Sequence, residues 1–120
     1  MKRTELSSRE ITNIVSQLLD DKKADNIVVI EMTEKTSMMD FMVIASGSSG
    51  RQVSALSNHL VQFFKQQGFK PHVEGLVQCD WVLVDIGDVI IHIFKPEARL
   101  FYDLEKMWGV SMSGSFSAET

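Results

Sequence analysis

Hydrophobic residues recur along the chain at two spacings, and the helical spacing dominates the N-terminal part. Ser7 followed by Glu10 has the form of a capping box, and apolar positions then repeat every three or four residues as far as about Asp21. These positions are Ile11, Ile14, Val15, Leu18 and Leu19. The pattern predicts a first amphipathic helix that begins just after Ser7.

Two more helices are predicted further along. One follows Gly50, ends at Gly68 and carries an apolar face. That face consists of Val53, Leu56, Leu60, Val61 and Phe64. Pro96 suits the first turn of a third helix, which is expected to run to about Trp108.

Short apolar runs rich in β-branched residues predict strands between these helices. The runs cover residues 27–32, 41–45, 72–74, 81–86 and 89–94, and residues 33–40 form a polar loop. The segment from 41 to 74 is expected to be a right-handed parallel crossover, whereas the last two strands form an antiparallel hairpin. The predicted fold is therefore a single α/β domain with a mixed, roughly five-stranded sheet in the order α-β-β-α-β-β-β-α, and three helices that can cover its faces.

The hairpin predicted at Gly87-Asp88 has two unlike faces. Pairing outward from the turn places β-branched aliphatic side chains together on one face. The opposite face carries Trp81, Leu83, Asp85, Ile90, His92 and Phe94. A face that mixes an acid and an imidazole with large apolar groups is neither a typical solvent face nor a typical core face. We therefore expect it to be a contact surface.

Composition favours a soluble cytoplasmic protein and allows a basic protein partner. The chain has 120 residues and a net charge of −4, so phosphate backbones repel it and specific nucleic-acid binding is disfavoured. The lone Cys79 cannot form an internal disulfide, and no apolar run is long enough to span a membrane. Residues 1–5 turn polar and acidic before an apolar stretch could form, so no signal peptide is expected. Residues 1–6 are expected to be a flexible lead, residues 7–108 the domain and residues 109–120 a disordered tail.

Two groups of residues raise the possibility of chemistry. The turn from Ser46 to Arg51 could hold an anion at a helix N-terminus, although capping of the helix by Ser48 or Ser49 is the favoured interpretation. Four acids near the hairpin could instead hold Mg²⁺ for nucleotidyl transfer, which requires two carboxylates two residues apart. These acids are Glu74, Asp80, Asp85 and Asp88. Asp85 and Asp88 are three apart and Asp88 lies in the turn, so no metal site is expected.

The histidines do not form a recognisable catalytic or zinc-binding pattern. His92 should lie opposite Leu83, either as a hydrogen-bonded half-buried imidazole or as an interface contact. Trp81 is equally compatible with the core and with a contact surface, because tryptophan anchors interfaces as well as cores. The residues thus indicate no catalytic centre and no cofactor.

Three motifs resemble the ribosomal silencing factor family, also called RsfS or Iojap. Residues 40–53 read DFMVIASGSSGRQV, residues 80–92 read DWVLVDIGDVIIH, and residues 102–108 read YDLEKMW. Glu74-Gly75 belongs to the same pattern, and the resemblance covers about residues 7–108. Gly50 departs from it, since the family usually has serine there.

The resemblance implies a fold similar to nucleotidyltransferases without their catalytic acids. It further implies binding to the large ribosomal subunit through its small basic ribosomal protein L-fourteen (uL-fourteen), which blocks docking of the small subunit and represses translation in starvation. Homodimers occur in the family, and relatives in organelles assist assembly of the large subunit.

On this basis we expect eight residues to contact the ribosomal protein. They are Glu74, Asp80, Trp81, Leu83, Asp85, Asp88, His92 and Tyr102. Trp81 and Leu83 would anchor the contact through apolar surface, and the acids would complement a basic partner. The alternative hypothesis is a small nucleotidyltransferase-like enzyme that uses the Gly-Ser turn and the hairpin acids.

Overall fold

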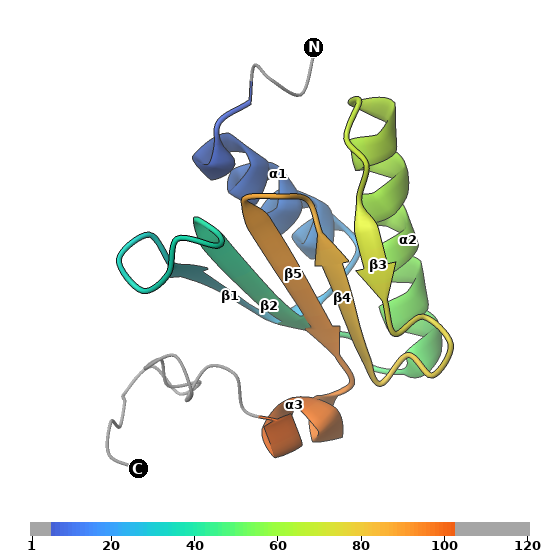
Figure 1. Ribbon diagram of the computed structural model, residues 1–120. Coiled ribbons are helices and arrows are strands. Elements are labelled where there is room, and N and C mark those ends of the chain that lie inside the picture. Colours follow the sequence, from blue (N-terminus) through green and yellow to red (C-terminus); the bar gives the residue numbers. More distant parts are fainter. Residues whose placement is uncertain (1–5, 103–120) are drawn as a thin grey trace.

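One mixed sheet organises the protein, and its elements follow in the predicted order. The computed structural model describes residues 6–102 (Figure 1). Its elements are α1 (Ser8–Asp21), β1 (Asp25–Glu31), β2 (Phe41–Ser46), α2 (Gly50–Gln66), β3 (His72–Glu74), β4 (Trp81–Asp85), β5 (Val89–Phe94) and α3 (Pro96–Tyr102). The expected extension of α3 to Trp108, the lead before residue 6 and the tail 109–120 lie outside the described residues. No helix within residues 6–102 is long and apolar enough to cross a bilayer.

The five strands lie in the order β1-β2-β5-β4-β3. β2 and β5 are parallel, whereas the other three neighbouring pairs are antiparallel. These pairings make β3 parallel to β2, as predicted for the segment from 41 to 74, with β5 and β4 between them. The α/β class and the mixed sheet are therefore confirmed, and β1 and β3 form the two edges.

Local hydrogen bonds explain where α1 and α2 begin. The Ser7 hydroxyl accepts from the Glu10 amide at 3.1 Å, and the Glu10 carboxylate accepts from the Ser7 amide at 2.8 Å. This is the predicted capping box, which satisfies two backbone donors that a helix start leaves unpaired. At α2 the Ser49 hydroxyl accepts from the Gln52 amide at 3.2 Å, so Ser49 caps the helix as expected.

The main core lies between one face of the sheet and the two long helices. Val82 pairs with Ile93 and Val84 with Ile91, which confirms the predicted hairpin register and places these four side chains against α1 and α2. The helices contribute Ile11, Val15, Leu19, Val53, Leu56, Leu60 and Phe64. Because β2 and β5 are central strands, their residues on this face are fully buried, and the core is continuous across the sheet.

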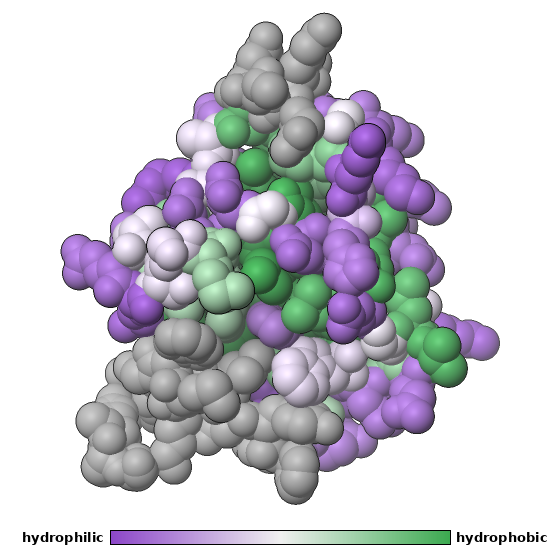
Figure 2. All heavy atoms as spheres, viewed as in Figure 1, coloured by the Kyte–Doolittle hydropathy of each residue, from purple (hydrophilic) through white to green (hydrophobic). Residues whose placement is uncertain are grey.

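The opposite face of the sheet is only partly covered. It carries a smaller cluster formed by Ile30, Met32, Met42, Ile44 and Phe94, with Trp81 and Ala98 packed at its border. Figure 2 looks onto this face and shows apolar surface over the centre of the sheet, flanked by hydrophilic side chains. Among the described residues α3 packs against this face at one end, whereas α1 and α2 pack on the other, so helices lie on both faces of the sheet.

A buried arginine attaches α3 to that end. The side chain of Arg99 is 2% exposed, and its guanidinium donates to the Ser46 hydroxyl at 2.8 Å. Ser46 is the last residue of β2, so this hydrogen bond joins α3 to the centre of the sheet rather than to an edge. A charge buried this deeply is tolerated only where hydrogen bonds satisfy it.

The loop between β3 and β4 depends on a glycine. Gly75 has φ +93°, and an added Cβ would collide with the carbonyl oxygen of Trp81. Gly68 has a similar φ of +91°, but open space surrounds its Cβ position. An alanine at position 68 would therefore introduce only the strain of positive φ, whereas an alanine at position 75 would introduce both that strain and the collision.

We predict that Gly75→Ala lowers the free energy of unfolding by about 3 kcal/mol or more, because it combines backbone strain with steric overlap. Gly68→Ala, the matched control, should lose only about 1 kcal/mol from strain alone. Urea unfolding of both variants measures the difference. Equal losses would show that the loop relieves the collision with Trp81 at no cost in stability.

Candidate functional site on the open face of the sheet

The open face presents the mixed side of the β4–β5 hairpin, as the sequence predicted. Trp81 pairs with Phe94, Leu83 with His92 and Asp85 with Ile90. Cross-strand neighbours stand side by side on the same face of a sheet, so Trp81, His92 and Phe94 lie next to one another. Of the three, Trp81 is half-buried, whereas His92 and Phe94 are buried.

The indole of Trp81 is held in place by both neighbours. Its Nε1–H donates to Nδ1 of His92 at 2.9 Å. Its ring stacks on Phe94 with centroids 5.1 Å apart and an interplanar angle of 27°. The ring therefore packs against the small core cluster with one side and remains half-buried, so both interpretations that the sequence left open are compatible with its position. A tryptophan held in this way loses little conformational entropy on binding a partner.

His92 was expected to be either a hydrogen-bonded imidazole or an interface contact, and the structure shows the hydrogen-bonded imidazole. It is 6% exposed, and burial lowers its pKa from 6.5 to about 4. Because Nδ1 accepts a hydrogen bond from Trp81, the imidazole is neutral in this arrangement and carries its own proton on Nε2. His92 therefore orients Trp81 from beneath and offers little surface of its own to a partner.

A groove opens beside Trp81. Its volume is about 430 Å³, and its lining is formed by Gly75, Val77, Gln78, Asp80 and Trp81. Val77 is 99% exposed at the tip of the loop between β3 and β4. The fully exposed aliphatic side chain and the half-buried tryptophan together form a small apolar patch beside the groove.

This loop is shaped by short-range contacts around Cys79. The Cys79 amide donates to the Gly75 carbonyl at 3.0 Å, and its thiol donates to the Leu76 carbonyl at 2.9 Å. Cys79 also adopts a positive φ of 58° while its side chain is buried. The fold thus turns the Leu76-Val77 pair outward. The sequence analysis missed these two residues, although two adjacent aliphatics between Gly75 and Asp80 were the available signal.

The acids of the candidate site do not converge. Asp80 pairs with Lys95 at 3.2 Å, and Glu74 contacts Nε2 of His72 at 2.8 Å. Asp85 accepts from the Gly87 amide at 2.8 Å, so it serves the hairpin turn. Asp88 is exposed in that turn. Within residues 6–102 no three acidic, histidine or cysteine side chains are grouped to hold a metal ion.

The hairpin acids fall into two positions relative to Trp81. Asp80 precedes it directly and lines the groove. Asp85 ends β4, about 13 Å further along the strand, and Asp88 lies beyond it. Leu83, half-buried, lies between the two ends. The side chain of Tyr102 lies outside the described residues, so its predicted contact stays a prediction.

The polar groups of the Gly-Ser turn before α2 form hydrogen bonds within the protein. The amide and hydroxyl of Ser48 both donate to Oε1 of Gln52, at 2.6 and 2.8 Å. The side-chain nitrogen of Gln52 donates in turn to the Lys23 carbonyl at 3.1 Å. These contacts link the turn to the end of α1. They favour the capping interpretation over an anion site.

Burial of His92 should make stability depend on pH. As pH falls from 6.5 towards about 4, the unfolded chain binds a proton at His92 while the folded chain does not, so the folded state loses stability across this window. His92→Gln keeps an acceptor for Trp81 but removes the titration. We predict that the loss of unfolding free energy between pH 7 and pH 5 is about 2 kcal/mol smaller in His92→Gln than in the unsubstituted protein. Urea unfolding at both pH values measures this.

The exposed His59 on α2 offers a matched control. His59→Gln should leave the pH dependence close to that of the unsubstituted protein. An unchanged pH dependence in His92→Gln would contradict the neutral, buried state of His92.

Comparison with known proteins agrees with the motifs. Residues 5–119 match the family model described as "Ribosomal silencing factor during starvation", RsfS. "Ribosomal silencing factor RsfS" of Zymomonas mobilis is 45% identical over 108 residues, which cover 89% of this chain and 81% of that protein. "Mitochondrial assembly of ribosomal large subunit protein 1" of mouse is 38% identical over 103 residues, which cover 82% of this chain and 45% of that protein.

A solved structure carries the same fold. The crystal structure of a Chromobacterium violaceum protein superposes with a TM-score of 0.86 at 34% identity and covers 96% of this chain and 98% of that one. The agreement thus extends over sequence and structure alike, and over nearly the full length of the chain. The chain belongs to the RsfS family of ribosomal silencing factors.

Proposed function

We propose that this protein binds the large ribosomal subunit and keeps the small subunit from docking, and so represses translation during starvation. The observation that carries the proposal is the family match over residues 5–119, whose description names both silencing and starvation. The mouse relative, whose name refers to assembly of the large subunit, supports the choice of that subunit. Occlusion requires a rigid domain at the docking surface and no chemistry, so we infer that the protein is not an enzyme.

We infer that the direct partner is ribosomal protein L-fourteen (uL-fourteen), a small basic protein. A net charge of −4 favours approach to a basic protein and disfavours binding to rRNA. Glu74 and Asp88 are exposed and Asp85 is half-buried, all along the hairpin and its neighbouring strand, where they supply negative charge to the contact. The protein is expected to act in the cytoplasm, and a homodimer is a further possibility that the family resemblance raises.

Trp81 is the proposed anchor of this contact. Its ring is half-buried, is held by Phe94 and His92, and borders a groove that can receive an apolar side chain. Interfaces draw most of their affinity from a few such residues, in particular tryptophan. Leu83 and Val77 extend the apolar surface, and Asp80 supplies charge at its border.

His92 and Tyr102 take part in different ways. Because His92 is buried, it acts by orienting the indole of Trp81 and not by direct contact. Tyr102 is the last described residue of α3, the helix that follows β5. It is proposed to contact the partner at the border of the interface.

Trp81→Ala should weaken binding to ribosomal protein L-fourteen by about 2 kcal/mol or more, roughly a thirtyfold loss of affinity. The cause is the loss of the anchoring ring. Trp81→Phe keeps a ring but not the donor to His92, and should lose less. Isothermal titration calorimetry with the purified ribosomal protein measures both.

His59→Ala on the exposed surface of α2 is the control and should bind normally. Circular dichroism establishes that each variant is folded. Full affinity in a well-folded Trp81→Ala variant would remove Trp81 from the interface.

Occlusion predicts a specific effect on ribosome assembly. Purified large subunits incubated with the protein should fail to join small subunits, as measured by light scattering, and the protein should sediment with large subunits but not with complete ribosomes. Trp81→Ala should require roughly thirtyfold more protein for the same inhibition, in line with its loss of affinity. Normal subunit joining with the protein bound would refute occlusion. Turnover of ATP with Mg²⁺ would instead favour the enzyme alternative.

A further inference from the structure

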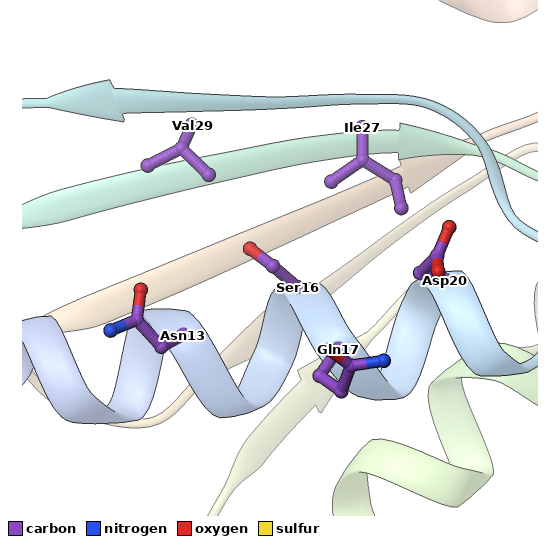
Figure 3. Close-up of a pocket in the computed structure, with 6 residues that line it drawn as sticks. All are labelled: Asn13, Ser16, Gln17, Asp20, Ile27 and Val29. Atoms are coloured by element: carbon purple, nitrogen blue, oxygen red, sulfur yellow. The ribbon is translucent and has the colours of Figure 1, made fainter.

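A second groove lies at the opposite edge of the sheet, between α1 and β1. Its volume is about 540 Å³. Ile27 and Val29 extend from β1 to form an apolar floor, and a polar stripe on α1 forms the wall (Figure 3). The stripe consists of Asn13, Ser16, Gln17 and Asp20. Val29 is 44% exposed, so α1 leaves the edge of the sheet partly uncovered.

The free edge of β1 offers backbone groups as well as this apolar floor. β1 is an outermost strand and pairs within the described residues only with β2. The Met32 amide donates to the Asp40 carbonyl at 2.7 Å, on the side of β2. Backbone groups alternate along a strand, so those of Ile30 also face β2, whereas those of Val29 and Glu31 face outward. An edge of this kind can pair with another strand.

Charge determines which strand fits. β1 reads DNIVVIE, with an acid at each end and no base. Asp20 on the wall of the groove adds a third acid, and Lys22 and Lys23 in the preceding turn offset part of this charge. Antiparallel pairing of β1 with β1 of a second copy about Val28 would bring Asp25 close to Glu31 at both ends, even with the irregularity between Asp25 and Val28. Like charges directly opposite destabilise a strand pair, so a second copy is disfavoured here.

We propose that the outer edge of β1 binds an extended polypeptide segment with alternating aliphatic side chains and a basic residue near each end. The segment adds to the sheet as a sixth strand, with main-chain hydrogen bonds to Val29 and Glu31. Its aliphatic side chains pack on Ile27 and Val29 in the groove. Its basic ends meet the acids at the ends of β1. This surface lies at the opposite edge of the sheet from Trp81 and goes beyond the function proposed above.

A seven-residue peptide matched to the length of β1 tests the proposal. The blocked peptide Lys-Thr-Val-Thr-Val-Thr-Lys places both valines and both lysines on one face of a strand. In a titration of the ¹⁵N-labelled full chain, followed by NMR, it should shift residues 25–31 and the α1 stripe in a saturable manner. The same peptide with glutamate at both ends should bind about tenfold more weakly, because its end charges oppose those of β1.

Two controls separate strand addition from simple charge attraction. The peptide Lys-Thr-Val-Pro-Pro-Thr-Lys keeps both charges, but adjacent prolines remove a donor whichever way the strand faces, so it should not bind. Glu31→Gln should weaken binding of the first peptide about two- to fivefold. Glu97→Gln removes the same charge from α3 and should have no effect.

Three results would overturn the proposal. They are equal binding of the proline peptide, peptide-induced shifts confined to the Trp81 face, and concentration-dependent shifts of β1 without peptide, which would identify a second copy as the occupant. Trp81→Ala should bind the peptide normally. Failure of this proposal is therefore distinguishable from failure of the ribosomal one.

Discussion

The pairing of β4 with β5 is the constraint on which the rest of the structure depends. Because side chains alternate along a strand, one register sends Val82, Val84 and their partners into the core and leaves the other set outside. A slip by one residue would bury Trp81 and Asp85 under the helices and expose the aliphatic face. The register of β4 against β5 therefore determines both the core and the candidate site.

This arrangement fixes the position of Trp81 on the open face while part of its ring stays exposed. Trp81 is held by a hydrogen bond to His92 and by stacking on Phe94, and Gly75 allows the neighbouring loop to approach its backbone closely. Each contact restricts the indole before any partner arrives. A partner that binds this face meets an indole that is already held in place, so little conformational entropy is lost on binding.

The two grooves occupy different faces and edges of the sheet. The groove at Trp81 lies by β4, whereas the groove at α1 lies at the free edge of β1, with β2 and β5 between these strands. One is built around an aromatic anchor and the other around backbone groups and acids. A small domain can thus present two chemically distinct surfaces, because a sheet has two faces and two edges.

The sequence alone determined whatever depends on near neighbours. The capping box at Ser7, the cap at Ser49 and the hairpin register were predicted, because each rests on residues close together in the chain. Tertiary structure decided the strand order, the burial of His92 and the exposure of Val77. These features depend on which distant segments lie next to a residue. The sheet places β1 and β3 at its two edges, and α1 and α2 pack on one face. Local sequence patterns do not contain that information, because burial is set by long-range packing.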